Sequence, residues 1–327
     1  MIKLVRIIKD NNYTDYSPQD LIQKDLNKFA GWKCSAGSEG LFIDWDGNIW
    51  PGTCFVGHND YLMGNINNTE SIKLHDSYIT CKFKMCPCLL EIYLPKYKSN
   101  INNLVESQES NTNTIDENFT AISRASDFDR GTKYIMWAFG RKCNFSCSYC
   151  DDVSHSKLDS DLVTYEAIQK VKKYAELYRQ NKPIQWSFTG GEPTINKYFL
   201  ELVKELKEMG DTITVATNGS ASSEYYAELA QYANINISVH FEFLKAAKLK
   251  KVTSAIIESN PDWFGLNFMA MPGNVEKCYD YYNELLSIKD FAQTVNCHFD
   301  MLRIKNEDEY HYYSDNDIKL LQELGQL

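Results

Sequence analysis

The sequence lacks long hydrophobic runs, and it carries fewer positive than negative charges. No apolar stretch approaches the ~18–20 residues that cross a bilayer. The first residues, MIKLVRIIKDNNYTDY, are interrupted by Lys3 and Arg6, and no small-residue cleavage site follows them. We therefore expect a cytoplasmic protein with no membrane span or signal peptide. The 34 Lys and Arg against 44 Asp and Glu give a net charge of −10, which disfavours nucleic acid as the partner.

The composition is that of a globular protein with an unusual number of cysteines. Of the 327 residues, 43% are hydrophobic and 24% are charged, and at ~100–200 residues per domain the length allows two domains. Without a secretory signal, metal or redox use of cysteine is favoured over disulfides. The ten cysteines are Cys34, Cys54, Cys81, Cys86, Cys88, Cys143, Cys147, Cys150, Cys278 and Cys297.

A polar stretch divides the chain. Residues 97–125 are rich in Asn, Ser and Thr and show little apolar periodicity, which is typical of a linker. We therefore predict a cysteine-bearing module over residues 1–96, a linker over 97–129 and a larger domain over 130–327.

The larger domain shows six alternations of a strand pattern with a helix pattern. This repeat predicts an α/β fold, a partial (β/α)6 TIM-like barrel with a parallel sheet and outer helices. The predicted strands are 134–139, 184–188, 212–217, 235–241, 265–270 and 295–301, and the predicted helices are 163–178, 197–209, 222–232, 244–258, 275–288 and 315–324.

Several of these strands have one polar and one apolar face. Strand side chains alternate with period 2, so Ser238, His240 and Glu242 share one face of the fourth strand. In the last strand, His298 and Asp300 alternate with apolar neighbours in the same way. The apolar faces should meet the helices, and the polar faces should line a lumen. The alternative, an antiparallel sheet with one solvated face, conflicts with the helix patterns between the strands.

Three cysteines follow the first strand of the larger domain. Cys143, Cys147 and Cys150 form a C-x3-C-x2-C motif with Tyr149 before the last cysteine. Such clustered thiolates indicate a metal site, and three ligands on a four-iron cluster leave one iron open. The alternative is a structural zinc site, completed by His155.

The motif CNFSCSYC resembles the signature of the radical S-adenosylmethionine (radical SAM) family. TGGEPT after the second strand and TNG after the third resemble two further motifs of that family, in the same order. The resemblance covers about residues 130–327. It implies that Cys143, Cys147 and Cys150 hold a [4Fe–4S] cluster and that SAM binds the open iron. Gly190, Gly191 and Glu192 would then bind the SAM amino group, and the other implied SAM contacts are Tyr149, Asn218, Ser238, His240 and Asn267.

The N-terminal cysteines flank a predicted hairpin. LFIDWDGNIW lies between Cys34 and Cys54 and has a tight turn at Asp46-Gly47 or Gly47-Asn48. The segment resembles the SPASM or Twitch auxiliary module, which normally follows the radical SAM domain. The two-cluster version has a further cysteine where this chain has Gly40, so the resemblance implies one auxiliary [4Fe–4S] cluster. Its ligands would be Cys34, Cys54, Cys86 and Cys88, with Cys81 as an alternative ligand.

A zinc site is the alternative for these N-terminal cysteines. The two remaining cysteines, Cys278 and Cys297, are predicted to be buried and inert.

The resemblance implies an oxygen-sensitive enzyme of oxidoreductase type. It would reductively cleave SAM to a 5′-deoxyadenosyl radical and abstract hydrogen from a polar substrate, in a net oxidation or cross-link of a peptide or protein side chain. Glu242, His298 and Asp300 are the candidate catalytic residues, and flavodoxin or ferredoxin is the expected reductant. The alternatives are dehydrogenation or rearrangement of a small polar metabolite (a sugar alcohol or a nucleoside-like compound), or a non-catalytic zinc-binding protein.

Overall fold

The chain divides into two compact units. In the computed structural model the first comprises Met1–Met136 with Gln169–Gln185, and the second comprises Trp137–Ile168 with Trp186–Leu327. The residues that the structure describes are 5–9, 12–68, 72–73, 75, 77–86, 91–98, 120–124, 131–150, 155–301 and 313–323.

The second unit is a mixed α/β fold with a parallel sheet at its centre. The strands follow one another in the order β15-β14-β13-β12-β11-β10, and β12 to β15 pair in parallel. The first residues of β10 and β11, up to Met136 and Gln185, belong to the first unit. The strands are β10 (Lys133–Ala138), β11 (Ile184–Thr189), β12 (Thr212–Thr217), β13 (Asn234–Val239), β14 (Phe264–Ala270) and β15 (Val295–Met301).

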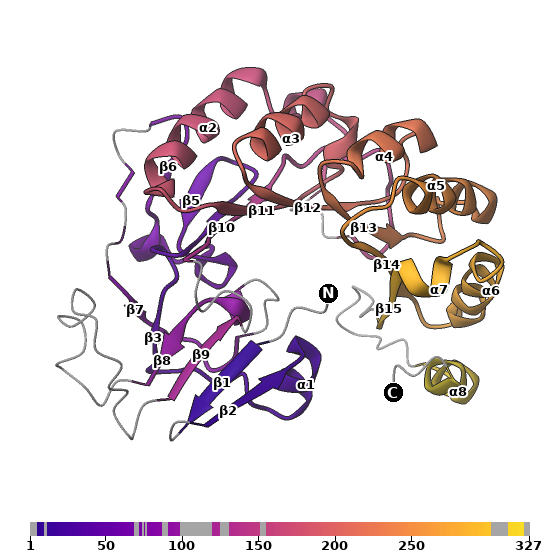
Figure 1. Ribbon diagram of the computed structural model, residues 1–327, viewed down its shortest axis with the longest axis horizontal. Helices are drawn as coiled ribbons and strands as arrows, with labels where there is room; N and C mark the ends of the chain where they lie inside the picture. Colours follow the sequence, from indigo (N-terminus) through magenta and orange to yellow (C-terminus); the bar gives the residue numbers. More distant parts are fainter. Residues whose placement is uncertain are drawn as a thin grey trace. The chain divides into compact units, whose positions relative to one another are not determined.

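A helix follows each of these strands, as the sequence predicts. Helices α3 to α6 lie along one side of strands β11 to β15 (Figure 1). The two predicted strands at 212–217 and 295–301 coincide with β12 and β15, and the other boundaries differ by a few residues. The helices are α2 (Tyr165–Arg179), α3 (Phe199–Glu208), α4 (Ser223–Leu229), α5 (Ala246–Glu258), α6 (Val275–Leu285), α7 (Phe291–Thr294) and α8 (Asp315–Glu323).

The predicted alternation of faces is present along β13, whereas His240 and Glu242, predicted on the same strand, follow its end. Along β13, Ile235, Ile237 and Val239 are fully buried, whereas the alternating Asn236 and Ser238 are half-buried. The apolar residues of one face of α3 are buried at helical spacing (Phe199, Leu202, Val203 and Leu206). Burial of both apolar surfaces explains why these strands and helices pack together.

The first unit contains a six-stranded sheet with the order β2-β1-β9-β8-β3-β7, in which every neighbouring pair is antiparallel. Residues 120–124, which lie within the predicted linker, form β9. Strands β1 and β2 were not predicted either. The elements are β1 (Val5–Lys9), β2 (Asn12–Tyr16), α1 (Pro18–Gln23), β3 (Lys33–Cys34), β7 (Ile79–Thr80), β8 (Lys96–Tyr97) and β9 (Thr120–Arg124).

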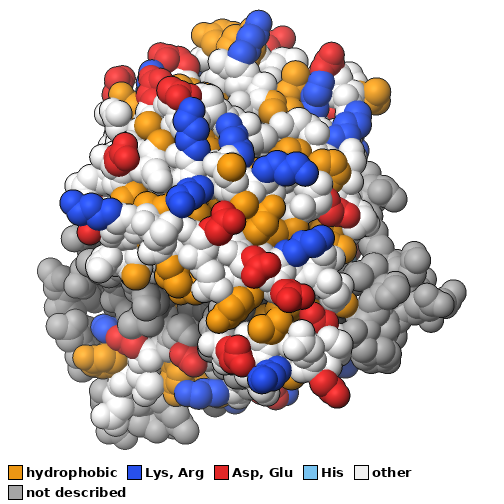
Figure 2. Space-filling view, turned by 90° about the vertical axis from the view of Figure 1, so that its right-hand side faces the viewer, with side chains coloured by type: hydrophobic (Ala, Val, Ile, Leu, Met, Phe, Trp, Pro, Cys, Tyr) orange, Lys and Arg blue, Asp and Glu red, His pale blue; other side chains and the backbone are white. Residues whose placement is uncertain are grey.

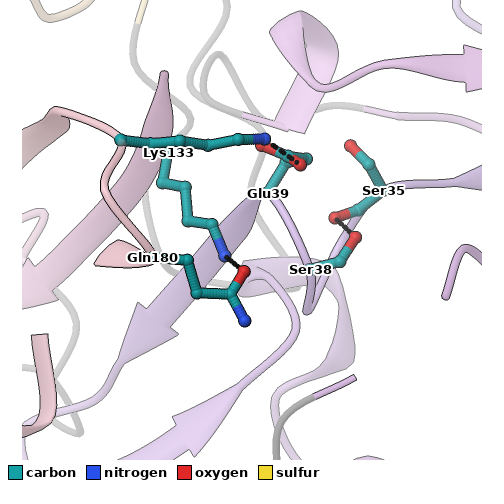
Figure 3. Close-up of polar contacts among 6 residues, drawn as sticks. Ser35, Ser38, Glu39, Lys133 and Gln180 are labelled. Atoms are coloured by element: carbon teal, nitrogen blue, oxygen red, sulfur yellow. Dashed lines mark hydrogen bonds and ion pairs between the residues drawn. The ribbon is translucent and has the colours of Figure 1, made fainter. Parts of the chain in front are cut away.

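Polar contacts join the N-terminal segment to the end of α2 within the first unit (Figure 3). Lys133 is buried, and its Nζ donates to Oε1 of Gln180 at 3.0 Å while lying 4.2 Å from the centre of the Tyr178 ring. Lys182 forms an ion pair with Glu39 at 3.0 Å. These contacts connect the residues at and after the end of α2 to Glu39 and to the start of β10.

The hairpin predicted between Cys34 and Cys54 is formed by β4 (Gly40–Ile43) and β5 (Asn48–Trp50), which pair antiparallel, and β6 (Gly64–Asn65) pairs with β5. The buried carboxylate of Asp44, 5% exposed, organises the turn. It accepts hydrogen bonds from the backbone N–H groups of Asp46 and Asn48 at 2.9 and 2.8 Å, from the Asn48 side chain at 3.0 Å and from the Trp50 indole at 2.8 Å.

Replacing Asp44 by alanine should lower the free energy of unfolding by about 2–4 kcal/mol, because buried donors lose a charged acceptor. Denaturant unfolding monitored by Trp fluorescence measures the loss. Asp46→Ala, at an exposed position of the same turn, is the control and should change stability by about 0.5 kcal/mol or less. Equal stability of the two variants would contradict the role given to Asp44.

The surface is mixed in charge. On the face shown in Figure 2, Lys and Arg side chains are interspersed with Asp and Glu, and hydrophobic side chains occur in small groups. Among the described residues, none of the helices is long and apolar enough to span a bilayer.

Candidate active site

The three-cysteine loop follows the carboxyl end of β10, within the second unit. Cys143 is buried at 8% exposure, and Cys147 and Cys150 are half-buried. Burial raises the pKa of Cys147 to about 12, and the nearby negative charges of Glu242, Cys143 and Cys150 add to the effect. Grouped thiols that resist ionisation on their own are stabilised as thiolates when a metal centre supplies positive charge.

Two N–H donors face the sulfur of Cys143, although burial raises the pKa of this thiol overall. It accepts hydrogen bonds from the backbone N–H of Phe145 at 3.4 Å and from Nδ2 of Asn218 at 3.6 Å. N–H donors directed at sulfur are a recurring feature around iron–sulfur clusters. The donor set and its surroundings therefore fit the [4Fe–4S] cluster that the motif implies.

The alternative for this loop is a single zinc ion. Within the described ranges, no group of three or more His, Cys, Asp or Glu side chains is arranged to hold one ion. A four-iron cluster binds each thiolate through a different iron, so its ligands need not converge on one point. His155, the residue that could complete a zinc site, has its Nε2 2.6 Å from the backbone oxygen of Phe145.

The Gly-Gly-Glu loop after β11 packs directly on the backbone that leads into the cysteine loop. The N–H of Gly191 donates to the oxygen of Gly140 at 3.0 Å, and the N–H of Glu192 donates to that of Lys142 at 2.9 Å. Gly190 has a φ of +114°, and a Cβ there would lie 2.6 Å from the Gly140 oxygen, while one on Gly191 would overlap the Lys142 carbonyl. The glycines thus permit close approach of two loops of the protein itself.

The carboxylate of Glu192 is buried, at 2% exposure, and all its described contacts are internal. Oε1 accepts from the Thr194 backbone at 3.1 Å, the Thr194 hydroxyl at 2.5 Å and the Thr217 hydroxyl at 2.6 Å. Oε2 accepts from the Asn218 backbone at 2.6 Å. Burial raises the pKa of Glu192, although these four donors act in the opposite direction. The carboxylate joins the Gly-Gly-Glu loop to the Thr-Asn-Gly motif.

The loop after β13 holds the other side of the cysteine loop. The Tyr149 hydroxyl lies 2.5 Å from Nδ1 of His240, and the two rings stack with their centres 5.8 Å apart. Burial lowers the pKa of His240 to about 4, so the imidazole is neutral at pH 7. Glu242, an expected catalytic residue, accepts from the backbone N–H of Ser148 at 2.8 Å. These contacts give Tyr149, His240 and Glu242 a structural part in the loop.

The remaining predicted site residues lie on neighbouring strands. Ser238 on β13 is in register with Asn267 on β14, which is in register with His298 on β15. The side chains of His298 and Asp300 lie outside the described part of the structure. No role was predicted for Thr194 or Thr217, although Thr194 lies in TGGEPT and Thr217 in TNG.

The N-terminal cysteines lie in the first unit, in two hydrophobic clusters. Cys34 belongs to a cluster with Phe55 and Leu94, against which Cys54 packs. Cys86 belongs to a second cluster, against which Cys81 packs. The Cys81 thiol donates to the Phe83 carbonyl at 3.7 Å. The predicted ligand Cys88 lies outside the described residues. Of the two isolated cysteines, Cys278 is fully buried, as predicted, and Cys297 is half-buried.

Comparison with known proteins finds similarity around the candidate site. The model of the radical SAM superfamily matches residues 137–259, a range that includes all three motifs. Similar proteins include the GTP 3′,8-cyclase of Sinorhizobium medicae, 28% identical over 46% of this chain and 44% of its own length. Another is the GTP 3′,8-cyclase of Peptoclostridium acidaminophilum, 30% identical over 49% of this chain and 45% of its own length.

The chain thus spans less than half the length of these relatives. Among solved structures, Streptococcus suis SuiB bound to S-adenosylmethionine is similar to this chain, with a TM-score of 0.44 and 15% identity, covering 59% of this chain and 46% of that one.

Proposed function

We propose that this chain is an enzyme that binds a [4Fe–4S] cluster through Cys143, Cys147 and Cys150 and reductively cleaves SAM. The observation that carries the proposal is the contact among three motifs: the Gly-Gly-Glu loop donates to the backbone at Gly140 and Lys142, and Asn218 donates to the Cys143 sulfur. When bound, the cluster supplies the electron that converts SAM to methionine and a 5′-deoxyadenosyl radical.

The residues of the chain would hold the reactants and exclude water. Tyr149 lies within the cysteine loop and its ring stacks on that of His240, so it can offer an aromatic surface to a bound ligand. Ser238 and Asn267 lie side by side on neighbouring strands, where they can hydrogen-bond the polar parts of SAM. Glycines 190 and 191 leave no side chain between the strand end and the cysteine loop.

Anaerobic purification followed by iron, sulfide and zinc analysis tests the proposal. About four irons per chain fit one cluster, and about eight fit two. With a strong reductant and SAM, the protein should release 5′-deoxyadenosine. Zinc without iron would contradict the proposal and would support the non-catalytic alternative.

We further propose one auxiliary [4Fe–4S] cluster on Cys34, Cys54, Cys86 and Cys88. Its support is the resemblance to the SPASM or Twitch module, the burial of Cys34 and Cys86, and the hairpin placed between Cys34 and Cys54. A zinc site on these cysteines is the competing assignment.

Replacing Cys34 by alanine should lower the iron content from about eight to about four atoms per chain, because one cluster loses a ligand. Metal analysis of the anaerobic variant measures the change, and Cys278→Ala, remote in sequence from both cysteine sets, should retain the wild-type content. Four irons in both the wild type and Cys34→Ala would contradict the auxiliary cluster.

For the substrate, we propose a small polar molecule of nucleotide type. The support is the name of the similar proteins, GTP 3′,8-cyclase, together with the half-buried polar residues Asn236 and Ser238 on β13. These relatives lend no support to the expected peptide substrate or net oxidation. With reduced flavodoxin or ferredoxin as the electron donor, the enzyme should consume SAM faster when GTP or another nucleoside triphosphate is added. The nucleotide should donate the hydrogen that is abstracted. Deuterium transfer from a peptide, but from no nucleotide, into 5′-deoxyadenosine would overturn this assignment.

A further inference from the structure

The sulfur of Cys143 differs from an ordinary buried thiol in the donors that surround it. One donor is the backbone N–H of Phe145, two residues along the same loop, at 3.4 Å. The second comes from a different element, because Asn218 follows β12 and its Nδ2 lies 3.6 Å from Sγ. Asn218 is only 4% exposed, so bulk water does not compete with the sulfur for its amide group.

The orientation of the Asn218 amide is fixed by its other contacts. Its Oδ1 accepts from the backbone N–H of Ser220 at 3.0 Å, and a flipped amide would place two donors against each other there. Nδ2 also donates to Oδ1 of Asn144 at 2.8 Å. With the oxygen committed to a backbone donor, the NH2 group must be the end of the side chain that faces the sulfur.

The Asn218 backbone is held as firmly as its side chain. Its N–H donates to the buried carboxylate of Glu192 at 2.6 Å, and the same carboxylate accepts from the Thr217 hydroxyl. Glu192 therefore places Asn218, and Asn218 reaches the cysteine loop. This chain of contacts links three loops through one amide.

We propose that Asn218 is a positioning residue that raises the reduction potential of the cluster at Cys143, an inference that rests on the proposed function. A hydrogen bond to a ligand sulfur withdraws electron density from the cluster, and it favours the reduced state because that state carries one more negative charge. The resemblance implied a contact of Asn218 with SAM, but the structure directs its amide to the cysteine sulfur.

The test is an anaerobic redox titration of the cluster without SAM, followed by electron paramagnetic resonance. In Asn218→Ala, at the ambient potential that half-reduces the wild type, the ratio of reduced to oxidised cluster should fall about tenfold, equivalent to about 59 mV for one electron. Asn218→Asp keeps the acceptor for Ser220 but loses the donor and adds negative charge, so its potential should fall further. This second variant decides the question should Asn218→Ala not fold.

Ser220→Ala is the matched control. It removes a hydroxyl that accepts from the Asn144 side chain at 2.8 Å but leaves the Asn218 contact to sulfur in place, so the wild-type potential should persist. An Asn218 variant that binds the cluster and has the wild-type reduction potential would overturn the inference while leaving the proposed function intact. Absence of iron from the wild-type protein would instead overturn the proposed function.

Discussion

Replacing Cys147 by alanine should abolish the release of 5′-deoxyadenosine from SAM. Cys147 is the middle ligand of the C-x3-C-x2-C motif, and its thiol lies close enough to Cys143 and Cys150 for their charges to raise its pKa. With two of three thiolates left, the loop can no longer retain a four-iron cluster with one open iron, and the electron donor to SAM is lost. Chromatography of anaerobic reactions containing SAM and a strong reductant measures the product.

The control for this variant is another cysteine. Cys278→Ala removes a fully buried thiol from α6, so it should cost some stability and leave SAM cleavage unchanged. The iron content separates the two effects, because Cys147→Ala should lose the iron of one cluster and Cys278→Ala should lose none. Continued 5′-deoxyadenosine release by Cys147→Ala would mean that the catalytic cluster has been assigned to the wrong cysteines.

The parallel-sheet unit could be predicted from sequence because its signals are local. Alternation of apolar and polar residues sets the strand faces, as in Ile235 to Val239, and the helix stripes have their own period. The strand β9 was missed because residues 120–124 lie next to a polar stretch of Asn and Ser, and only its pairing with β1 and β8 identifies it as part of a sheet. That pairing is a long-range contact, which no local pattern reports.

The candidate site could also be predicted only in part. The three motifs could be predicted to meet, because the carboxyl ends of neighbouring parallel strands share one edge of a sheet. The direction of each side chain could not be predicted. Glu192 bonds to Thr217 and Asn218, 25 and 26 residues away, and a carboxylate beside two glycines suits either a ligand ammonium or an internal donor.

Replacing Glu192 by alanine distinguishes these two roles and should have the largest effect on stability. The substitution leaves four buried donors without their acceptor, from Thr194, Thr217 and Asn218. At about 1–3 kcal/mol for each unsatisfied buried donor, offset by relief of the buried charge, the free energy of unfolding should fall by about 3–5 kcal/mol. Denaturant unfolding of the cluster-free protein without SAM measures the change.

Glu208→Ala, at an exposed position at the end of α3, is the control and should change the free energy of unfolding by about 0.5 kcal/mol or less. Glu192→Gln preserves the volume but turns an amide NH2 toward some of the donors, so its stability should lie between those of the wild type and Glu192→Ala. If Glu192 instead acted only on the SAM ammonium, all three variants would unfold like the wild type, and Glu192→Ala would lose SAM affinity alone. Because four donors from the protein converge on the carboxylate, we expect the loss of stability.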